Sequence, residues 1–393
     1  MSHTKYLIIG GGMTADSAVQ GIRKVDASGS IGIISADSHP PYNRPPLSKG
    51  LWKGDPIESI WRKTEGPGVE LHLGGEASHL NVNDKRVTDS QGTIHTFDKL
   101  LLATGGRVRR LDFGGNHIIY FRTVDDYQRL RALAERGKRF AVIGGGFIGW
   151  EIAAALAMNG RTVTMLFPDE GIGSRIYPRG LSQFLNTFYR EKDVQVLAGE
   201  TAVALESRGE TLVLKTQSGR TVEVDGIAAG IGIQPNTELA EAAGLKLGNG
   251  IVVDENLQTS HPDIYAAGDV AEFYNPALGK RMRVEHEDNA NTMGQAAGEA
   301  MAGNATPYHH LPFFYSDLFD LGYEAVGDLD SRLETFSDWK TPQREGVVYY
   351  LENGRVRGVL LWNTWGQVDH ARKLIAEPGP LKGADLKGRL PVQ

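Results

Sequence analysis

The clearest chemical signal in the sequence is a glycine-rich turn between an apolar run and a helix. Residues 6–9 have the length of a buried parallel strand and lead directly into Gly10 and Gly12. Small and apolar residues follow at helical spacing, with Ala15 at the position where the helix must approach the strand closely. A strand, a tight turn and a helix N-terminus present unpaired N–H groups to a phosphate. The chemistry indicated is binding of a dinucleotide through its pyrophosphate.

The same pattern occurs a second time. Residues 138–156 again read as a strand, glycines and a helix, here with Gly144, Gly146 and Gly149 all present. One such pattern is weak evidence, whereas two copies that each open a strand–helix unit favour two nucleotide-binding domains and two different dinucleotides. The alternative of two ordinary strand–helix turns stays open at this point.

Acidic residues after the second strand of each unit are the expected partners of ribose hydroxyls. In the first unit the candidate is Asp37, which could equally be a turn residue. In the second unit Asp169 follows the strand 162–167, and a carboxylate there repels a 2′-phosphate. NADH is therefore favoured over NADPH, although the nearby Arg175 and Arg179 weaken this preference.

The proline-rich segment 40–52 reads as a rigid irregular loop that fixes two cations, Arg44 and Lys49. In a structural interpretation they are solvated loop charges. In a functional interpretation they meet a pyrophosphate and the edge of a flavin.

Three further segments end in residues that could contact a ligand. The apolar strand that ends in Ala-Thr-Gly at 103–105 suggests close backbone approach, and Arg109 is then a ligand cation or a solvated residue. Asp269 stands at the carboxyl end of the strand 264–269, where ligands bind in such sheets. A metal site at the helix start around His286 is not predicted, because acids are common at helix starts.

Length and composition limit the class of protein. At 393 residues the chain suits two or three domains, and a net charge of −6 argues against a broad nucleic-acid interface. No apolar run is long enough for a bilayer, and the first strand leaves no room for a signal peptide, which favours the cytoplasm. The absence of cysteine excludes a redox-active disulfide and thiolate metal sites.

Periodicity predicts the remaining elements. From about Thr306 the chain becomes rich in aromatic residues, which are interpreted as the core of a third domain. We expect helices at 125–135, 181–191, 284–301 and 369–375, strands within 69–101 and 194–224, one strand at 227–236, and a hairpin at 347–362.

Together these residues resemble the FAD- and NAD-dependent reductases of the glutathione-reductase fold. Within that group the sequence is similar to apoptosis-inducing factor and to the ferredoxin reductases of oxygenase systems. The resemblance covers essentially the whole chain, through PPYNRPPLSKGLW, LLLATGG, VIGGGFIGWE, LFPDEG, GIGIQPN, IYAAGD, VEHEDNA, FFYSDL and GYEAVGD, in that order.

The resemblance implies FAD in the first domain and NADH in the second. The positions that it assigns to FAD are Gly10, Gly12, Met13, Thr14, Ala15, Asp37, Arg44, Lys49, Ala77, Ala103, Thr104, Gly105, Arg109, Gly268, Asp269, His286 and Tyr315. Those assigned to NADH are Gly144, Gly146, Phe147, Ile148, Gly149, Asp169, Arg175, Gly232, Glu285, Glu324 and Asn363. The residues expected nearest the reaction are Lys49, Phe147, Glu151, His286 and Tyr315.

Three departures from the family pattern matter. The acid usual directly after the second strand is Ala36 here, so Asp37 is a shifted substitute. The aromatic residue facing the flavin is usually Trp and is Tyr315 here. The loop insertion and targeting segment of the mitochondrial factor are not found, which argues against carrying over its role in cell death.

The sequence therefore predicts an α/β protein with two Rossmann-like dinucleotide-binding domains and a C-terminal α+β domain. The FAD domain (1–108 and 240–306) is expected to be split around the NAD domain (109–239), with the third domain at 307–393. Lys49 and Glu151 are expected to form a direct ion pair, because neither charge should be buried without a partner.

The predicted reaction is hydride transfer from NADH to flavin N5, with electrons passed to a non-disulfide acceptor. A small iron–sulfur protein such as a ferredoxin, a quinone and oxygen are the acceptors left open. The rival interpretation is a slow NADH sensor that signals through a stable reduced charge-transfer complex and a change of partner or homodimer contacts. A third is a simple NAD-binding module.

Overall fold

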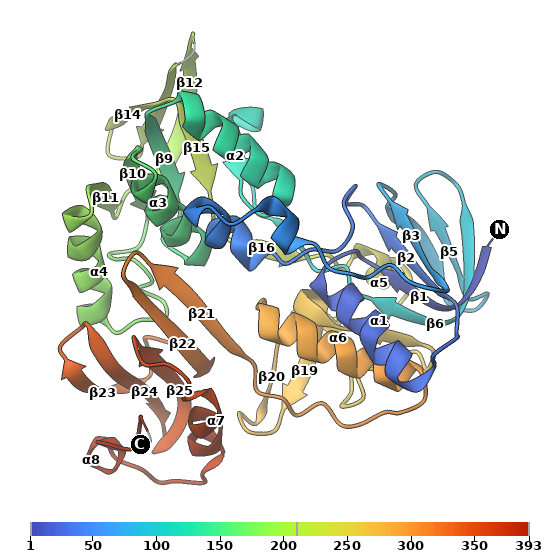
Figure 1. The fold of residues 1–393 in the computed structure, drawn as a ribbon. Helices are drawn as coiled ribbons and strands as arrows, with labels where there is room; N and C mark the ends of the chain where they lie inside the picture. Colours follow the sequence, from blue (N-terminus) through green and yellow to red (C-terminus); the bar gives the residue numbers. More distant parts are fainter. Residues whose placement is uncertain (1, 210, 392–393) are drawn as a thin grey trace. The chain divides into compact units, whose positions relative to one another are not determined.

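The computed structural model describes residues 2–209 and 211–391 and divides the chain into two compact units (Figure 1). The first unit contains the chain up to Asn43 together with Ile57–Arg107 and Gln234–Pro312. The second contains Arg44–Pro56, Val108–Ile233 and the chain from Phe313 onward. Each unit is thus assembled from three separate stretches of sequence.

The first unit is built on a seven-stranded sheet in the order β3-β2-β1-β6-β5-β4, with β18 also paired to β6. Its strands are β1 Ser2–Ile9, β2 Ile31–Ser35, β3 Val69–Leu73, β4 Ala77–Asn81, β5 Arg86–Asp89, β6 Ile94–Leu102 and β18 Ile264–Ala266. β1, β2, β3, β6 and β18 are parallel, and their register brings Ile9, Ile34, Leu102 and Ala266 to one edge. The first glycine turn follows directly at this carboxyl edge, where ligands bind in such sheets.

Two helices of the first unit, α1 and α6, lie side by side (Figure 1). Their close contact depends on glycine: a Cβ at Gly21 would lie 2.1 Å from the Gln295 carbonyl oxygen, and one at Gly298 would lie 2.1 Å from that of Ala18. The remaining bounds in this unit are α1 Met13–Val25, α5 Glu238–Ala242, α6 Glu287–Met301, the 3-10 helices η3 Ile57–Ile60 and η5 Gly268–Val270, and a small sheet of β17 Ile251–Val252, β19 Ala271–Asn275 and β20 Lys280–Met282.

The second unit contains a five-stranded parallel sheet in the order β11-β10-β9-β15-β8. Apart from the edge strand β11, its strands are short and almost wholly buried, as expected for a sheet covered on both faces. The bounds are β8 Ile118–Tyr120, β9 Arg139–Ile143, β10 Thr162–Phe167, β11 Val194–Ala198 and β15 Gly226–Ala229, with α2 Val124–Arg136, α3 Phe147–Met158, α4 Arg179–Glu191 and η4 Gly115–His117. A three-stranded meander of β12 Ala202–Arg208, β13 Thr211–Thr216 and β14 Thr221–Val224 follows β11.

The C-terminal part of the second unit is an antiparallel sheet in the order β21-β22-β25-β24-β23. The prediction of an aromatic core is confirmed for Tyr323, Tyr349, Tyr350 and Trp362, which are fully buried, whereas Trp365 is exposed. The bounds are β21 Phe313–Leu318, β22 Leu321–Gly327, β23 Glu334–Thr341, β24 Glu345–Glu352, β25 Arg355–Trp362, α7 Val368–Ala376 and α8 Gly383–Leu386.

The predicted fold class is confirmed, since the chain combines Rossmann-like parallel sheets with a C-terminal sheet domain. Three local predictions were wrong. The segment 40–52 is not wholly irregular, because it contains the 3-10 helices η1 Pro45–Ser48 and η2 Gly50–Lys53. The strand expected at 227–236 is interrupted at Gly230–Gly232 and yields β15 and β16 Ile233–Pro235, which pairs with β7 Gly106–Val108. The helix expected from 284 begins at Glu287, because His286 is extended.

The boundaries expected for the FAD, NAD and C-terminal domains stay a prediction. No helix within 2–209 and 211–391 is both long and apolar enough to cross a membrane. Over the same residues, no three His, Asp or Glu side chains are grouped in a way that could hold a metal ion.

Candidate functional site

The first glycine turn has the geometry of a phosphate-binding turn. Gly10 has a φ of +115°, and a Cβ there would lie 2.1 Å from the carbonyl oxygen of Ala103, so only glycine fits. Gly12 is the N-cap of α1, and no described side chain caps this helix. Its first N–H groups are therefore directed toward any anion at the sheet edge. Ala15 is fully buried, as close helix–strand packing requires.

Several predicted FAD positions come together around this turn within the first unit. A Cβ at Gly268 would lie 2.3 Å from the Thr14 hydroxyl, which places the start of η5 against the first turn of α1. Ala103 lies against Gly10, and the Thr104 hydroxyl donates to the Asn236 carbonyl at 2.7 Å. The carboxyl ends of β6 and β18, which precede residues 103 and 268, thus lie at the same sheet edge as the glycine turn.

Other predicted FAD positions in this unit are held by local structure. Asp37 accepts hydrogen bonds from the His39 N–H at 3.0 Å and the Tyr42 hydroxyl at 3.2 Å, so it shapes the turn after β2. Arg283 donates to the Asp269 carbonyl at 2.8 Å and lies 2.6 Å from the Glu285 carboxylate. The other positions are Met13 at the start of α1, Ala77 at the start of β4, Gly105 with a φ of +60°, and His286 as the N-cap of α6.

The predicted FAD set is divided between the two units. Arg44, Lys49, Arg109 and Tyr315 belong to the second unit and the other predicted FAD positions to the first. The Arg109 N–H donates to the Gly232 carbonyl at 3.0 Å, and Gly232 has a φ of +91°.

The second glycine turn shows a clear division of roles. A Cβ at Gly144 would lie 2.3 Å from the Gly230 carbonyl oxygen, and one at Gly149 would lie 2.0 Å from that of Gly144. These two glycines therefore permit close backbone packing. A Cβ at Gly146 would meet no described atom within 4 Å, so its open side leaves room for a phosphate. Gly146 is also the N-cap of α3, and Ile148 on the first turn lies against Gly230.

Asp169 stands after β10, where the sequence predicts the ribose contact. Its carboxylate lies 3.7 Å from the Arg175 guanidinium, and the Arg175 side chain is 82% exposed. The pair is therefore loose and screened, and both side chains are accessible to a ligand.

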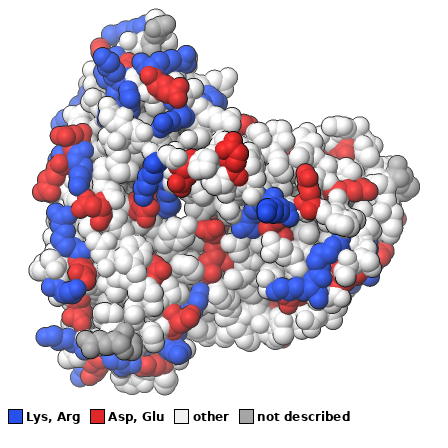
Figure 2. All heavy atoms as spheres, in the orientation of Figure 1, with Lys and Arg blue, Asp and Glu red and all other residues white. Residues whose placement is uncertain are grey.

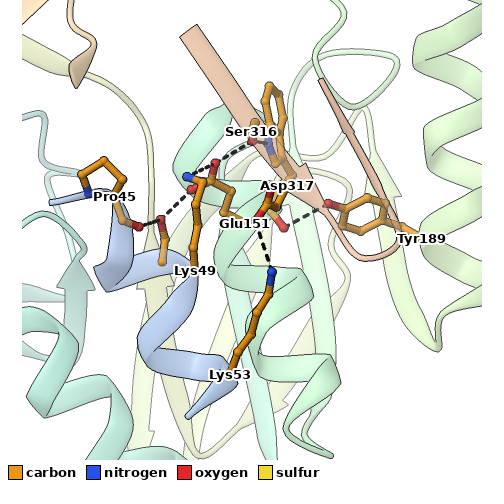
Figure 3. A network of polar contacts seen from close by, with 9 residues as sticks. Pro45, Lys49, Lys53, Glu151, Tyr189, Ser316 and Asp317 are labelled. Atoms are coloured by element: carbon orange, nitrogen blue, oxygen red, sulfur yellow. Dashed lines mark hydrogen bonds and ion pairs between the residues drawn. The ribbon is translucent and has the colours of Figure 1, made fainter. Parts of the chain in front are cut away.

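Buried polar residues gather at the start of α3 (Figure 3). The ion pair predicted from the sequence is confirmed: Lys49 Nζ lies 2.7 Å from Glu151 Oε1. The Glu151 side chain is 4% exposed and that of Lys49 is 14% exposed. Ser48 donates to Oε2 and Ser316 to Oε1, each at 2.5 Å. The carboxylate is thus enclosed by three donors from two parts of the chain, residues 48–49 and β21.

Aromatic rings adjoin this buried pair. Phe147, the first residue of α3, has its ring 4.9 Å from that of Trp150 and 5.8 Å from that of Phe314. The Tyr315 ring lies 5.3 Å from the Lys49 ammonium, within range of a cation–π contact. Tyr315 therefore adjoins the ion pair directly. Phe147 is linked to it through Trp150, whose indole N–H donates to Ser316.

Two residues predicted to contact NADH form hydrogen bonds within the protein. Asn363 has a φ of +46°, and its side-chain amide bridges the Gly322 N–H at 2.8 Å and the Arg344 carbonyl at 2.9 Å. Glu324 accepts from the Gly366 N–H at 3.0 Å. Their contact with NADH stays a prediction.

Sequence reasoning missed the residues that support the site. Ser48 directly precedes Lys49, and Ser316 alternates with Tyr315 along β21, so period-two spacing was the only signal for Ser316. In the first unit Arg62 contacts the buried Asp16 at 2.9 Å and donates to the Met13 carbonyl at 3.2 Å, which fixes the first turn of α1. No motif marks Arg62.

Comparison with known proteins gives a consistent result. Residues 4–294 match the family described as pyridine nucleotide-disulphide oxidoreductase, and residues 297–345 match the C-terminal family of mitochondrion-associated apoptosis-inducing factor. Apoptosis-inducing factor 1, mitochondrial, of Dictyostelium discoideum is 35% identical over 94% of this chain and 78% of its own.

The bacterial relatives and the structures agree with this match. The ferredoxin–NAD(+) reductase component of the 3-phenylpropionate/cinnamic acid dioxygenase of Photorhabdus laumondii is 33% identical over 96% of this chain and 98% of its own. The crystal structure of the covalent putidaredoxin reductase–putidaredoxin complex matches with a TM-score of 0.92 and 28% identity, over 100% of this chain and 97% of that one. The chain therefore belongs to the pyridine nucleotide-disulphide oxidoreductase family of flavin-dependent enzymes.

Proposed function

We propose that this protein is an NADH-dependent flavoprotein reductase that passes electrons through FAD to a one-electron acceptor of the ferredoxin type. The observation that carries the proposal is the enclosed Lys49–Glu151 pair at the start of α3, the helix that Phe147 begins. A buried ion pair contributes little to stability compared with well-packed apolar residues, so its presence at the start of a nucleotide-binding helix favours an electrostatic role.

The residues present fit FAD in the first unit. Gly10 and Gly12 form the turn, the N-terminus of α1 is uncapped by described side chains, and residues 103 and 268 complete the edge. When bound, FAD supplies the ring that accepts a hydride. In this proposal the FAD-binding domain is residues 1–108 and 240–306, and Lys49 stabilises the negative charge that the ring gains.

The second glycine turn supports NADH as the electron donor. Gly146 leaves open space at the N-terminus of α3, which suits a pyrophosphate. Asp169 supports NADH over NADPH, because its carboxylate would accept hydrogen bonds from the ribose hydroxyls of NADH and repel the 2′-phosphate of NADPH. Its contact with Arg175 is the feature that opposes this preference.

The acceptor is proposed from chemistry and relatives together. The chain has no cysteine, so electrons do not leave through an internal disulfide, despite the name of the family. Two bacterial relatives are named as ferredoxin reductases, and one matched structure is a reductase bound to putidaredoxin. On the face drawn in Figure 2, basic and acidic side chains are interspersed. Recognition of an acidic partner would therefore depend on local groups such as Arg107, which is 48% exposed and contacts Glu238.

The test uses the purified 393-residue chain. We expect a yellow protein with about one flavin per chain that is bleached rapidly by NADH and more slowly by NADPH. The reduced protein should then reduce a plant- or putidaredoxin-type iron–sulfur protein faster than it reduces a quinone or oxygen. A colourless protein that takes up no FAD, or a flavin that NADH does not reduce, would contradict the proposal.

The match of residues 297–345 to the C-terminal family of apoptosis-inducing factor favours a second candidate, a slow NADH sensor. A sensor would stay reduced in a long-wavelength charge-transfer state and would change its homodimer or partner contacts. Reoxidation within seconds by an iron–sulfur protein supports the reductase, whereas persistence of that absorption for minutes in air supports the sensor.

A further inference from the structure

The Glu151 carboxylate is held by more donors than an ion pair needs. Both of its oxygens are engaged: Ser48 donates to Oε2 at 2.5 Å, while Ser316 at 2.5 Å and Lys49 at 2.7 Å share Oε1. We call these four residues the Glu151 cluster. All of them belong to the second unit, and Figure 3 shows Lys49, Glu151 and Ser316 pointing toward one another.

The hydroxyl protons of the two serines have defined directions. Ser316 accepts a hydrogen bond from Trp150 Nε1 at 2.8 Å, and an indole N–H can only donate. The single Ser316 proton is therefore left for Glu151. Ser48 lies 3.5 Å from the Pro45 carbonyl but 2.5 Å from Glu151, so its proton also points to the carboxylate. Because Ser316 is fully buried, water cannot replace its hydroxyl.

We propose that Ser48 and Ser316 are positioning residues that fix the Glu151 carboxylate and, through it, aim the Lys49 ammonium. The terminal torsion of a glutamate is otherwise broad, and donors on both oxygens lock it. Lys49 then meets one oxygen, Oε1, from one direction, with the Tyr315 ring 5.3 Å away.

The serines also determine how strongly Glu151 attracts Lys49. Each serine hydroxyl donates a hydrogen bond that partly neutralises the carboxylate charge. Hydrogen bonds to a charged group are strong in a buried setting. Without one of them, Lys49 is drawn more closely to Glu151 and its charge is less available elsewhere. This step rests on the proposed function, in which Lys49 stabilises the flavin as it gains electrons.

The first experiment measures flavin reduction at saturating NADH by stopped flow. Ser316→Ala and Ser48→Ala should each reduce the limiting rate by about tenfold and lower the flavin potential, with KM for NADH little changed. Ser316→Cys, which keeps the size and a weak donor, should fall between Ala and wild type. The matched control is Thr216→Val, which removes a buried hydroxyl that lies 3.2 Å from the Ser218 hydroxyl, and should keep the wild-type rate.

A double-mutant cycle separates positioning from general damage. If the serines act through Lys49, Ser316→Ala should change the rate by less than about twofold in a Lys49→Gln background. An equal effect with and without Lys49, or a wild-type rate and potential in both serine variants, would overturn the proposal.

The same cycle on urea unfolding of the flavin-free chains needs no activity. We expect Ser316→Ala and Lys49→Gln to be clearly non-additive, because both groups share Oε1. Additive losses would refute the coupling. If NADH does not reduce the wild type, the proposed function fails, while the unfolding cycle still decides whether Ser316 and Lys49 are coupled through Glu151.

Discussion

Lys49 stands at the junction of two short helices, η1 and η2, and its ammonium lies 2.7 Å from the carboxylate of Glu151 on α3. The two residues are 102 positions apart in sequence. Two prolines begin η1, and their fixed φ presets the path of the chain toward Lys49. The ammonium is thus delivered by a rigid local segment rather than by a flexible loop.

Replacing Lys49 tests its proposed electrostatic role. Lys49→Ala should slow flavin reduction by NADH at least about tenfold and lower the flavin potential, because Glu151 is left as an uncompensated buried charge. The matched control is Lys53→Ala, which removes a half-exposed lysine paired with Asp317 at 3.2 Å and should have little effect. Stopped-flow reduction and a redox titration measure both variants, and equal behaviour of the two would show that Lys49 has no special role.

Asp169 and Arg175 are expected to set the choice of nucleotide in opposite directions. Asp169→Ala should raise the NADPH-to-NADH ratio of kcat/KM by about tenfold, because the repulsion of a 2′-phosphate is lost. Arg175→Ala should strengthen the NADH preference. The variant keeps the hydrogen bond from the Ser331 N–H to the Arg175 carbonyl, because that bond involves only backbone atoms. Steady-state kinetics with both nucleotides provide the measurement. A wild type that prefers NADPH would assign the dominant role to Arg175.

Asp225 makes stability depend on pH at the acidic end. The Arg139 side chain, with backbone N–H groups of Lys138 and Arg139, lowers the pKa of Asp225 from 3.8 to about 2. Because the folded pKa is the lower one, this stabilisation is present above about pH 4 and is lost as the pH falls toward 2.

The corresponding variant is Asp225→Asn, compared with wild type by urea unfolding from pH 7 to pH 2.5. The difference in unfolding free energy should be constant down to about pH 4 and should shrink below it. Glu223→Gln, which removes a 57%-exposed carboxylate 3.5 Å from Arg139, should change little. A pH-independent difference for Asp225→Asn would contradict the assignment.

The contact between α1 and α6 predicts a large effect from a single methyl group. Gly298→Ala would place a Cβ 2.1 Å from the Ala18 carbonyl oxygen, so the helices must separate, at a cost of about 1–3 kcal/mol. Gly180→Ala is the matched control. Among the described residues outside its own helix, a Cβ there would meet only the Gln343 side chain, at 3.8 Å, so the change should be neutral or stabilising by about 0.5–1 kcal/mol. Thermal unfolding distinguishes the two, and similar shifts would show that α6 can move.

The features predicted most accurately from the sequence are those formed by residues that are contiguous in the chain. Both glycine turns were found because strand, turn and helix N-terminus are contiguous, and the structure gives Gly10, Gly144 and Gly149 backbone neighbours that exclude a side chain. The Lys49–Glu151 pair was found through family resemblance and charge pairing, not through local spacing.

What was missed depends on contacts between distant segments. The break in the strand expected at 227–236 arises where Gly230 packs against Gly149: a Cβ at Gly230 would lie 2.9 Å from the Gly149 backbone nitrogen. No local pattern reveals that approach. Alternation along β21 indicated two faces but not that Ser316 would meet Glu151. The partner of Arg62, Asp16, lies 46 residues away in sequence.

The pairing of β18 with β6 has a consequence for synthesis on the ribosome. Leu100–Leu102 cannot complete their sheet until Ile264–Ala266 have been translated, because these residues are direct partners. At 5–20 residues per second, that interval is on the order of ten to thirty seconds. During it the edge of β6 and the face of α1 that α6 later covers are exposed in the nascent chain. The first unit must therefore mature after much of the second has been made, and early folding intermediates would be natural clients of chaperones.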